Sequence, residues 1–538
     1  MVEEFDLVIK NGIIVDGTGS PWFRNDIAIK DGKILKIGKV KEKGEVEIDA
    51  TNLVVSPGFI DLHNHSDMTI LAYPNAESYI MQGVTTAIVG NCGLSMAPVN
   101  PDKVDLLKRY LAPFLAKDFE YGWDWKTLGE FYEKIEKQGT TMNLVPLVGH
   151  GTVRLAVKGF DPDKSSKEEL EEMKSLVAQA MEEGAFGMST GLIYPPGSYS
   201  PTEEIIELAK VIAEYGGIYT THMRNESKRL IEAVEEAIRI GEEAGVPVEI
   251  SHHKASGRPN WGKVCATLRL MKRARERGVE VNCDVYPYTA GSTTITALLP
   301  NWALEGGVNK MLERLKDKET RERIKLEIEE DRMIGENFLK AAGWEGVLIS
   351  QCLIEEYEGK TLEQILREKG TFNKPYEGLF DWLIEIKGSA AMVIFIMDEE
   401  DVKTVISHPL SMIISDSWVT TPYAGGKPHP RAYGTFPRVL RKYVREEKLL
   451  SLEEAIRKMT SLPAAKVRLQ DRGLIKEGFW ADLVIFDPNK IMDKATYQDP
   501  HQYPEGINYV IVNGQIVVEN GKLTGKRPGK VIKKVYTR

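Results

Sequence analysis

The chain has 538 residues, which is too long for one ordinary domain but suits a barrel with added segments. A hydrophobic content of 42% and a charged content of 28% are typical of a soluble globular protein. The net charge is −9 and no basic block is present, which argues against a nucleic-acid partner.

The sequence offers no targeting signal. Its first residues contain neither a basic stretch nor a long apolar stretch, so we expect no signal peptide. No apolar run approaches the roughly 18 residues of a membrane-spanning helix. The four cysteines, at positions 92, 265, 283 and 352, are too few and too widely spaced for a disulfide framework. These features predict a cytoplasmic protein without a membrane partner and leave the oligomeric state open.

The two ends of the chain have the pattern of a small β domain. Residues 1–55 contain short β-branched runs separated by strong turn signals, namely Asn11-Gly12, Asp16-Gly17 and Asp31-Gly32. Two similar runs, 481–486 and 510–518, lie near the other end. We therefore expect residues 1–55 and 472–538 to pack together as one β-sandwich domain.

Between these ends, over residues 56–471, strands alternate with helices. The strand candidates are 59–63, 85–92, 144–150, 185–189, 219–222, 248–252, 281–284 and 412–416. Capping boxes at Ser166-Lys167-Glu168-Glu169 and Ser200-Pro201-Thr202-Glu203 predict helices over 170–183 and 204–215, the second with Pro201 at its first position. A third helix is expected over 231–244. This alternation predicts an α/β fold of the (β/α)8, TIM-like type.

The spacing between the seventh and eighth strand candidates is unusually long. Residues 300–405 interrupt the alternation, and 309–331 is highly charged with a helical pattern. An insertion over the barrel mouth explains this stretch better than a very long loop. The alternative is a helical appendage with no role in the site.

His63 and His65 follow the first strand candidate of the barrel. Residues two apart in an extended chain point to the same face, so both imidazoles can reach one metal ion. The alternative is a pair of histidines exposed at a strand end, and the spacing alone does not separate the two.

Other metal-ligand residues also lie where apolar strands end. They are Cys92, His150, His222, His252 and Asp416. In a barrel of this kind the reacting groups lie at the carboxyl ends of the strands, so this pattern favours a metal site. A lone cysteine beside apolar residues is more often inert, but a thiolate at a strand end is a strong zinc ligand. His253 must point to the opposite face from His252, and we interpret it as structural.

Asp416 ends the last apolar strand candidate. A buried carboxylate there needs a partner, and water on a metal supplies one. Such a group can take a proton from water whose acidity zinc raises and return it to a leaving amine. The alternative is an aspartate that caps the following turn.

Seven motifs are spread along nearly the whole chain. They are residues 58–67 (Gly-Phe-Ile-Asp-Leu-His-Asn-His-Ser-Asp), Gly90-Asn91-Cys92-Gly93, 187–197, 221–226, 251–254, 286–293 and 428–438, which begins Pro-His-Pro-Arg. In these motifs the chain resembles the N-acyl-D-amino acid deacylases (D-aminoacylases) of the amidohydrolase superfamily. The first motif marks the superfamily broadly, whereas the cysteine and Pro-His-Pro-Arg motifs are far more specific.

The resemblance implies a role for each matching residue. One zinc ion would be held tightly by Cys92, His222 and His252, and a second, weaker site would use His63 and His65 with Cys92 between them. The remaining implied roles are Asp416 as general acid/base, Tyr286 as oxyanion stabiliser, Arg431 and Lys254 as carboxylate binders, and Tyr194 and Ser292 as pocket residues. One departure is Ser417, where the family usually has glycine, and the loop after it also differs.

The resemblance implies a zinc-dependent hydrolase that cleaves the amide bond of N-acyl-D-amino acids, a small-molecule substrate. Related enzymes that act on D-residue dipeptides or cyclic amides are alternatives. A non-catalytic barrel with a structural metal is an alternative from another class. A structural zinc site uses four protein ligands and no general base, whereas three ligands and Asp416 are implied here.

Overall fold

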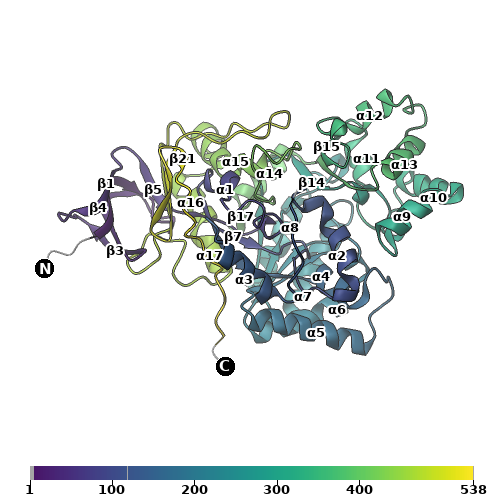
Figure 1. Ribbon diagram of the computed structural model, residues 1–538, viewed down its shortest axis with the longest axis horizontal. Coiled ribbons are helices and arrows are strands. Elements are labelled where there is room, and N and C mark those ends of the chain that lie inside the picture. Colours follow the sequence, from purple (N-terminus) through teal and green to yellow (C-terminus); the bar gives the residue numbers. More distant parts are fainter. Residues whose placement is uncertain (1–4, 118, 537–538) are drawn as a thin grey trace.

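The structure, a computed structural model, describes residues 5–117 and 119–536. Three parts lie side by side, with the β domain at one end, the barrel in the middle and the inserted helices at the far end (Figure 1). Among the described residues, no helix is long and apolar enough to cross a membrane. All four cysteines are free thiols, and only Cys265 is exposed.

Strands from both ends of the chain form the small β-sandwich domain. The strands are β1 (Phe5–Ile14), β2 (Phe23–Lys30), β3 (Lys33–Gly38), β4 (Gly44–Asp49), β5 (Val54–Pro57), β18 (Leu483–Phe486), β19 (Ile507–Val512), β20 (Gln515–Glu519) and β21 (Lys522–Leu523). They are hydrogen-bonded as one nine-stranded sheet in which β18 runs antiparallel to β5. Leu7, Ile27, Leu483 and Ile511 share a hydrophobic core inside it. The pairing of the two ends is therefore as expected.

Two of the predicted turns of this domain have different outcomes. Asp31 (φ 52°) and Gly32 (φ 77°) form the tight turn between β2 and β3, as two left-handed residues in a hairpin do. Asn11 is also left-handed, at φ 61°, but it lies inside the continuous strand β1, where the register with β2 shifts. The Asn11-Gly12 turn signal therefore marks a bulge.

Parallel strands enclose the barrel. In order around it they are β6 (Phe59–Asp61), β7 (Val84–Val89), β8 (Asn143–Pro146) continued by β9 (Val148–Gly149), β10 (Gly187–Gly191), β11 (Ile218–His222), β12 (Val248–Ile250), β13 (Val281–Val285) and β17 (Ser411–Ile413). A parallel bridge between Asn64 and Ser417 joins the first strand to the last. The chain therefore has the predicted (β/α)8 architecture.

Helices surround the barrel strands (Figure 1). They are α1 (Glu77–Ile80), α2 (Val104–Leu111), α3 (Leu128–Gln138), α4 (His150–Lys158), α5 (Lys167–Glu182), α6 (Thr202–Glu214), α7 (Leu230–Ala244), α8 (Val264–Glu276), α14 (Glu399–Ser407), α15 (Arg431–Arg438), its π-helical continuation η9 (Val439–Glu446), α16 (Leu452–Met459) and α17 (Ser461–Lys466). The predicted capping box that opens α5 is present. The Ser166 side chain accepts a hydrogen bond from the Glu169 backbone, and the Glu169 side chain accepts one from the Ser166 backbone.

The prediction of a capping box at the start of α6 is wrong. Pro201 is the N-cap residue of this helix, and no side chain there accepts a backbone N–H. The hydroxyl of Ser200 instead lies 3.4 Å from Nε2 of His150, the first residue of α4. The Ser200 side chain, which the local pattern predicted as a helix cap, therefore makes a tertiary contact instead.

The insertion lies between β13 and β17 and combines helices with a small sheet. Its elements are β14 (Ala290–Thr294), α9 (Val308–Arg314), α10 (Lys318–Glu329), α11 (Phe338–Ala342), β15 (Val347–Cys352), α12 (Leu362–Glu368), α13 (Pro375–Glu385) and β16 (Ala390–Phe395). The sheet has the order β14-β16-β15, both pairs antiparallel. We did not predict these strands, because β14 has few large apolar residues and its partner lies far along the chain.

Candidate metal centre and substrate site

The predicted site residues meet at the carboxyl ends of the barrel strands. One cavity of about 40 Å³ is lined by all of them except His63, namely His65, Cys92, Tyr194, His222, His252, Lys254, Tyr286, Ser292, Asp416 and Arg431. His63 is fully buried, and its Nε2 atom lies 3.2 Å from Cys92 Sγ. Side chains that are distant in sequence therefore surround one small space.

Cys92 belongs to two groups of potential metal ligands. Its Sγ atom lies 3.9 Å from His222 Nδ1 and 3.6 Å from His252 Nε2. The ligand atoms of these three residues lie within 4.8 Å of one another, and all three residues are buried. A thiolate and two imidazoles in such a group suit Zn²⁺, and three protein ligands leave one position for water or substrate.

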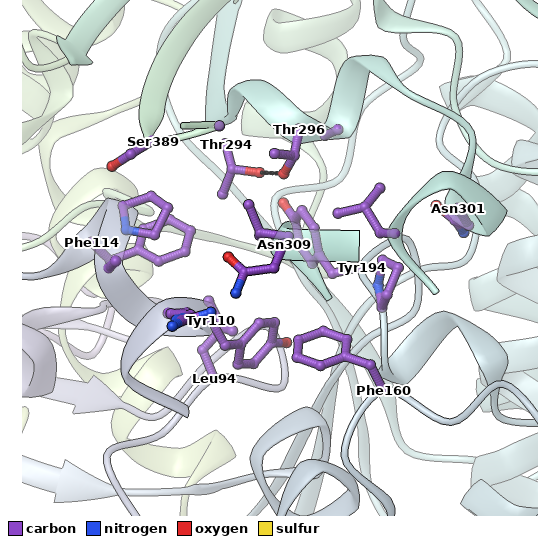
Figure 2. A pocket seen from close by; sticks show the side chains of 18 of the residues that line it. Leu94, Tyr110, Phe114, Phe160, Tyr194, Thr294, Thr296, Asn301, Asn309 and Ser389 are labelled. Carbon is purple, nitrogen blue, oxygen red and sulfur yellow. Dashed lines mark hydrogen bonds between the residues drawn. The ribbon is translucent and has the colours of Figure 1, made fainter. Parts of the chain in front are cut away.

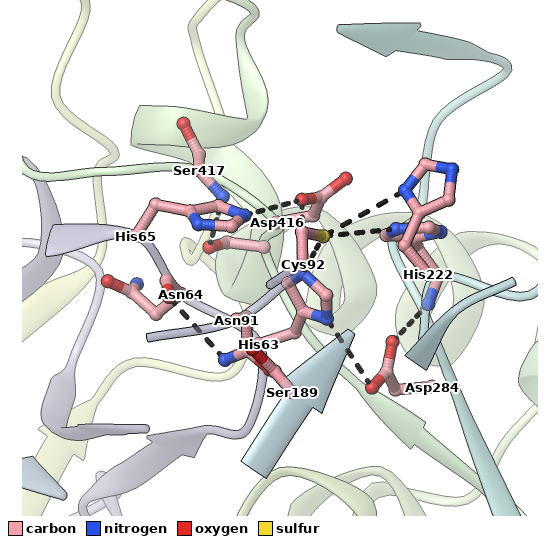
Figure 3. Close-up of polar contacts among 12 residues, drawn as sticks. His63, Asn64, His65, Asn91, Cys92, Ser189, His222, Asp284, Asp416 and Ser417 are labelled. Carbon is pink, nitrogen blue, oxygen red and sulfur yellow. Dashed lines mark hydrogen bonds and ion pairs between the residues drawn. The ribbon is translucent and has the colours of Figure 1, made fainter. Parts of the chain in front are cut away.

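The second group shares Cys92 and adds His63, His65 and Asp416. The Nε2 atoms of both histidines lie 3.4 Å from Asp416 Oδ1. Figure 3 shows Cys92 between the His63 and His65 side and the His222 side. The thiol is thus placed where one sulfur could contact two metal ions. The resemblance implied His63, His65 and Cys92 for this second site, and the structure adds Asp416 to the group.

The backbone at His63 and His65 is not the extended strand that the sequence predicted. Strand β6 ends at Asp61, and His65 has φ −121° and ψ 22°, so the chain is no longer extended there. Two backbone hydrogen bonds to the last strand fix the turn instead, from Asp416 N to His63 O (3.0 Å) and from His65 N to Ser417 O (2.8 Å). The imidazoles still lie close, with ring centroids 5.3 Å apart.

Three residues of the site have left-handed backbones. They are Cys92 (φ 52°), His252 (φ 37°) and Asp416 (φ 52°). Such values are uncommon outside glycine and cost roughly 1–3 kcal/mol each, so the surrounding structure must impose them. Each residue directly follows or closely follows a barrel strand, where the turn redirects its side chain toward the cavity. Three of the potential ligands therefore have strained backbones.

The protonation states favoured by the fold suit a cation. Burial holds the pKa of His63, His222 and His252 well below the usual value, so these imidazoles are neutral, as metal ligands must be. Burial, and then the charge of Asp416, raise the pKa of the Cys92 thiol well above its usual value. A thiolate at this position needs a nearby positive charge, which a bound zinc ion would supply. The donors present therefore fit the metal that the resemblance implies.

Glu226 supports the first ligand group from outside, a role that the sequence analysis did not assign. Its Oε1 atom lies 2.9 Å from His252 Nδ1, so it can accept a hydrogen bond from the ring nitrogen that faces away from Cys92. Its Oε2 atom lies 3.9 Å from His222 Nε2. A carboxylate in this place fixes the tautomer and orientation of a ligating histidine. Its position four residues after His222, within a motif of the resemblance, was the available signal.

The cationic groups beside the ligands could bind an anion. Arg431 is 1% exposed, and its Nη1 atom lies 2.9 Å from Asp416 Oδ2. This ion pair lacks hydrogen-bonding geometry, and among the residues that the structure describes no acceptor is in place for Arg431 Nε or Nη1. Burial would raise the pKa of Asp416, but the positive charge of Arg431 is the largest opposing influence, and the pKa is held well below its usual value.

Tyr286 and Lys254 lie beside this arginine. The guanidinium carbon of Arg431 is 4.6 Å from the centre of the Tyr286 ring. Lys254 Nζ is 5.8 Å from the same ring and donates to both Glu226 oxygens, at 2.8 and 2.7 Å. Burial would lower the pKa of Lys254, but Glu226 outweighs this effect and raises it to about 12. The fold therefore holds two cations in the wall of the cavity, both near the Tyr286 ring.

Two further histidines lie outside the ligand groups. His150 begins α4, and its Nε2 atom lies 3.3 Å from Glu204 Oε1. The strand-end position of His150 therefore did not indicate a metal ligand. His253 Nε2 lies 2.8 Å from Thr267 Oγ1 on the outer side of its strand, which agrees with a structural role.

Comparison with known proteins identifies the family. Residues 46–518 match the sequence profile described as "Amidohydrolase family". The chain is 35% identical to the D-aminoacylase of Alcaligenes xylosoxydans xylosoxydans, over 98% of each protein. The chain belongs to the D-aminoacylase family of amidohydrolases. Its first 59 residues also match the profile of the N-terminal domain of the urease alpha-subunit, which agrees with the sheet domain at this end.

Solved structures of this family superpose over nearly the full length. A D-aminoacylase described for its binuclear metal center, with one-metal activation and second-metal attenuation, has a TM-score of 0.82 and 34% identity, and the match covers 98% of this chain and 100% of that one. The N-acyl-D-glutamate deacylase of Bordetella bronchiseptica, complexed with zinc and a phosphonate mimic of the tetrahedral intermediate, has a TM-score of 0.82 and 33% identity over 99% and 100% of the two chains. Relatives of this chain thus bind metal ions, one of them at a binuclear metal center and another as a zinc complex.

Proposed function

We propose that this protein is a zinc-dependent hydrolase that cleaves the amide bond of N-acyl-D-amino acids to a carboxylate and a D-amino acid. Family membership supports this reaction, because relatives of similar length carry the names D-aminoacylase and N-acyl-D-glutamate deacylase. The observation that carries the proposal is one small cavity lined both by potential metal ligands and by the cations Arg431 and Lys254. An N-acyl amino acid offers a carbonyl to the metal ligands and a carboxylate to the cations.

We propose that the tight zinc site consists of Cys92, His222 and His252, and that His63 and His65 with Cys92 form a weaker second site. When bound, zinc would polarise the amide carbonyl and raise the acidity of a water molecule. Asp416, whose carboxyl is ionised, would accept a proton from the water that attacks the carbonyl carbon. It would then give this proton to the amide nitrogen as the carbon–nitrogen bond breaks.

The remaining residues would orient the substrate. The Tyr286 hydroxyl would donate a hydrogen bond to the oxygen that becomes negative during the attack. Arg431 would bind the substrate carboxylate with its fork of N–H groups, two of which have no acceptor. Lys254 would add a second positive charge, while Tyr194 and Ser292 line the pocket. Fixing the carboxylate and the carbonyl leaves one face of Cα for the side chain, which distinguishes D from L.

The test compares matched D and L N-acetyl amino acids, with zinc content measured on the same preparation. We expect hydrolysis of the D isomers, about one tightly held zinc ion per chain, and little turnover when the carboxylate is amidated. Rapid hydrolysis of D-residue dipeptides or cyclic amides, with none of the N-acetyl amino acids, would contradict the proposal. Full zinc occupancy without any hydrolysis would instead favour a structural metal.

A further inference from the structure

A second and much larger cavity opens beside the metal ligands. Its volume is about 340 Å³, within the range of roughly 300–1,000 Å³ typical of pockets that enclose small organic ligands. Most of its wall is apolar and includes Leu94, Phe114 and Phe160 (Figure 2). Ile193, Leu304 and Val308 also line it. Its two charged lining residues, Arg109 and Lys387, are exposed, so their charges are solvated. The enclosed part therefore suits an uncharged group.

This cavity, which we call the apolar cavity, adjoins the small cavity of the site. Leu94, Phe114 and Tyr194 line both cavities. The ring of Tyr194 packs against His222 with centroids 5.2 Å apart, and the ring of Phe114 lies 6.4 Å from that of His65. One layer of aromatic side chains thus contacts the potential metal ligands on one face and the apolar cavity on the other.

The apolar cavity lies away from the anion-binding groups. Arg431, Lys254 and Tyr286 all line the small cavity, and none of them lines the large one. In an N-acyl amino acid, the carboxylate and the acyl substituent lie on opposite sides of the scissile bond. With the carboxylate at Arg431 and the carbonyl at the metal centre, the acyl substituent points away from Arg431. The side chain on Cα, by contrast, stays near the carboxylate.

We infer that the apolar cavity binds the acyl group, and that the protein prefers N-acyl-D-amino acids with long aliphatic or aromatic acyl groups over N-acetyl ones. This inference rests on the proposed function and specifies its substrate class. A methyl group would fill little of a space that could hold many waters of about 30 Å³ each. The insertion supplies part of the wall, through Leu304, α9 at Val308, and Gly388. The insertion therefore helps to select the substrate.

The experiment varies one half of the substrate at a time. The first series keeps one D-amino acid and changes the acyl group from acetyl to butanoyl, hexanoyl, octanoyl and benzoyl. We expect kcat/KM to rise about fourfold for each methylene group that enters the cavity, which corresponds to about 0.8 kcal/mol, until the cavity is full. The second series keeps the acetyl group and changes the side chain from D-alanine to D-leucine and D-phenylalanine. We expect a smaller change there.

Two variants fill the apolar cavity from different walls. Ala297→Phe adds a ring from the segment after β14, and Val308→Trp adds one from α9. Each should abolish the gain from longer acyl groups while leaving kcat/KM for the acetyl substrate within about threefold. Ala297→Ser, which adds no bulk, is the matched control and should behave as the parent. As an independent measurement, octanoate should inhibit the parent more strongly than acetate and lose this advantage in both filled variants.

The outcomes separate this inference from the proposed function. Strong hydrolysis with no dependence on acyl length would overturn the assignment of the apolar cavity and leave the reaction intact. Filled variants that impair the side-chain series and spare the acyl series would also overturn it, because the cavity would then bind the side chain. No hydrolysis of any N-acyl-D-amino acid by zinc-loaded protein would overturn the proposed function itself.

Discussion

Glu226→Gln is the substitution that most directly tests how the metal ligands are held. The parent carboxylate is 2% exposed and interacts with His252 at 2.9 Å and with Lys254 at 2.8 and 2.7 Å. The amide of glutamine has nearly the same shape but no charge. It therefore removes the electrostatic contribution with little change in packing.

Two losses are expected, and both follow from these contacts. Removing one partner of a buried ion pair costs about 3–5 kcal/mol, because Lys254 is left buried without a counter-charge. Removing the carboxylate behind a ligating histidine weakens metal binding by about 10–100-fold. The amide oxygen can still accept a hydrogen bond from His252, so we expect the lower part of that range.

Zinc affinity would be measured by competition with a chelator, and stability by the thermal midpoint of the zinc-loaded protein. The double variant Glu226→Gln/Lys254→Met separates the two effects, because it removes both charges of the pair. It should regain much of the thermal stability while its zinc affinity stays low. Zinc affinity within twofold of the parent in Glu226→Gln would refute the argument, since Glu226 would then serve only to balance Lys254.

Four further variants test individual groups. Cys92→Ser should lose tightly bound zinc together with activity, and full zinc content with full turnover would show that the thiol is not a ligand. Asp416→Asn should keep zinc by elemental analysis yet lose about 10²–10⁴ in kcat, and a loss of only a few-fold would remove it from proton transfer. Arg431→Lys keeps the charge but not the fork, so steady-state kinetics should show KM rising more than kcat falls. Burial would raise the pKa of Glu204, but His150 and Arg154 outweigh it and lower that pKa to about 2. The unfolded chain therefore binds more protons between about pH 2 and 4.5, so the stability that Glu204 contributes, about 3 kcal/mol, is present above this window and lost as pH falls through it. Thermal midpoints across that window should vary less with pH in Glu204→Gln, and an unchanged pH dependence would contradict this assignment.

The barrel could be predicted from the sequence because its strands are local features. Each strand is a short apolar run followed by a turn, and each predicted helix near 170–183, 204–215 and 231–244 has a regular apolar face. Figure 1 shows how these units close around one core. The insertion sheet could not be predicted in the same way. Residues of β14 pair with β16 about a hundred positions later, so the pairing depends on tertiary contacts that no local pattern records.

The candidate site shows the same division between local and tertiary information. His222, His252 and Cys92 could be proposed because they end or follow apolar strands in a barrel whose strands all end at one edge. His150 satisfies the same pattern but contacts Glu204, so the pattern alone selects one residue too many. Glu226 was overlooked because its role depends on the direction of its side chain toward His252. That direction is fixed by the loop that carries it.

The segment that carries Arg431 is held in place by His429. His429, two residues earlier, accepts a hydrogen bond from Arg431 N at 3.0 Å and contacts the carbonyl of Ala290 at 2.9 Å. It thus attaches the start of α15 to the first strand of the insertion. The motif could be recognised from the sequence, but this attachment could not, because Ala290 lies far away along the chain.

The junction between the first and last barrel strands passes directly through the ligand groups. His63 and His65 follow the first strand, Asp416 and Ser417 follow the last, and backbone hydrogen bonds join the two segments. A cation held by His63, His65 and Asp416 would therefore act as a clasp across a loop of some 350 residues, whose closure is entropically unfavourable. Binding energy gained there would be folding energy as well. Loss of the metal should therefore loosen the barrel first at this junction. We expect hydrogen exchange in the metal-depleted protein to be faster in β6 and β17 than in β11 and β12. The protein would then lose its structure at the same place where it loses its metal site.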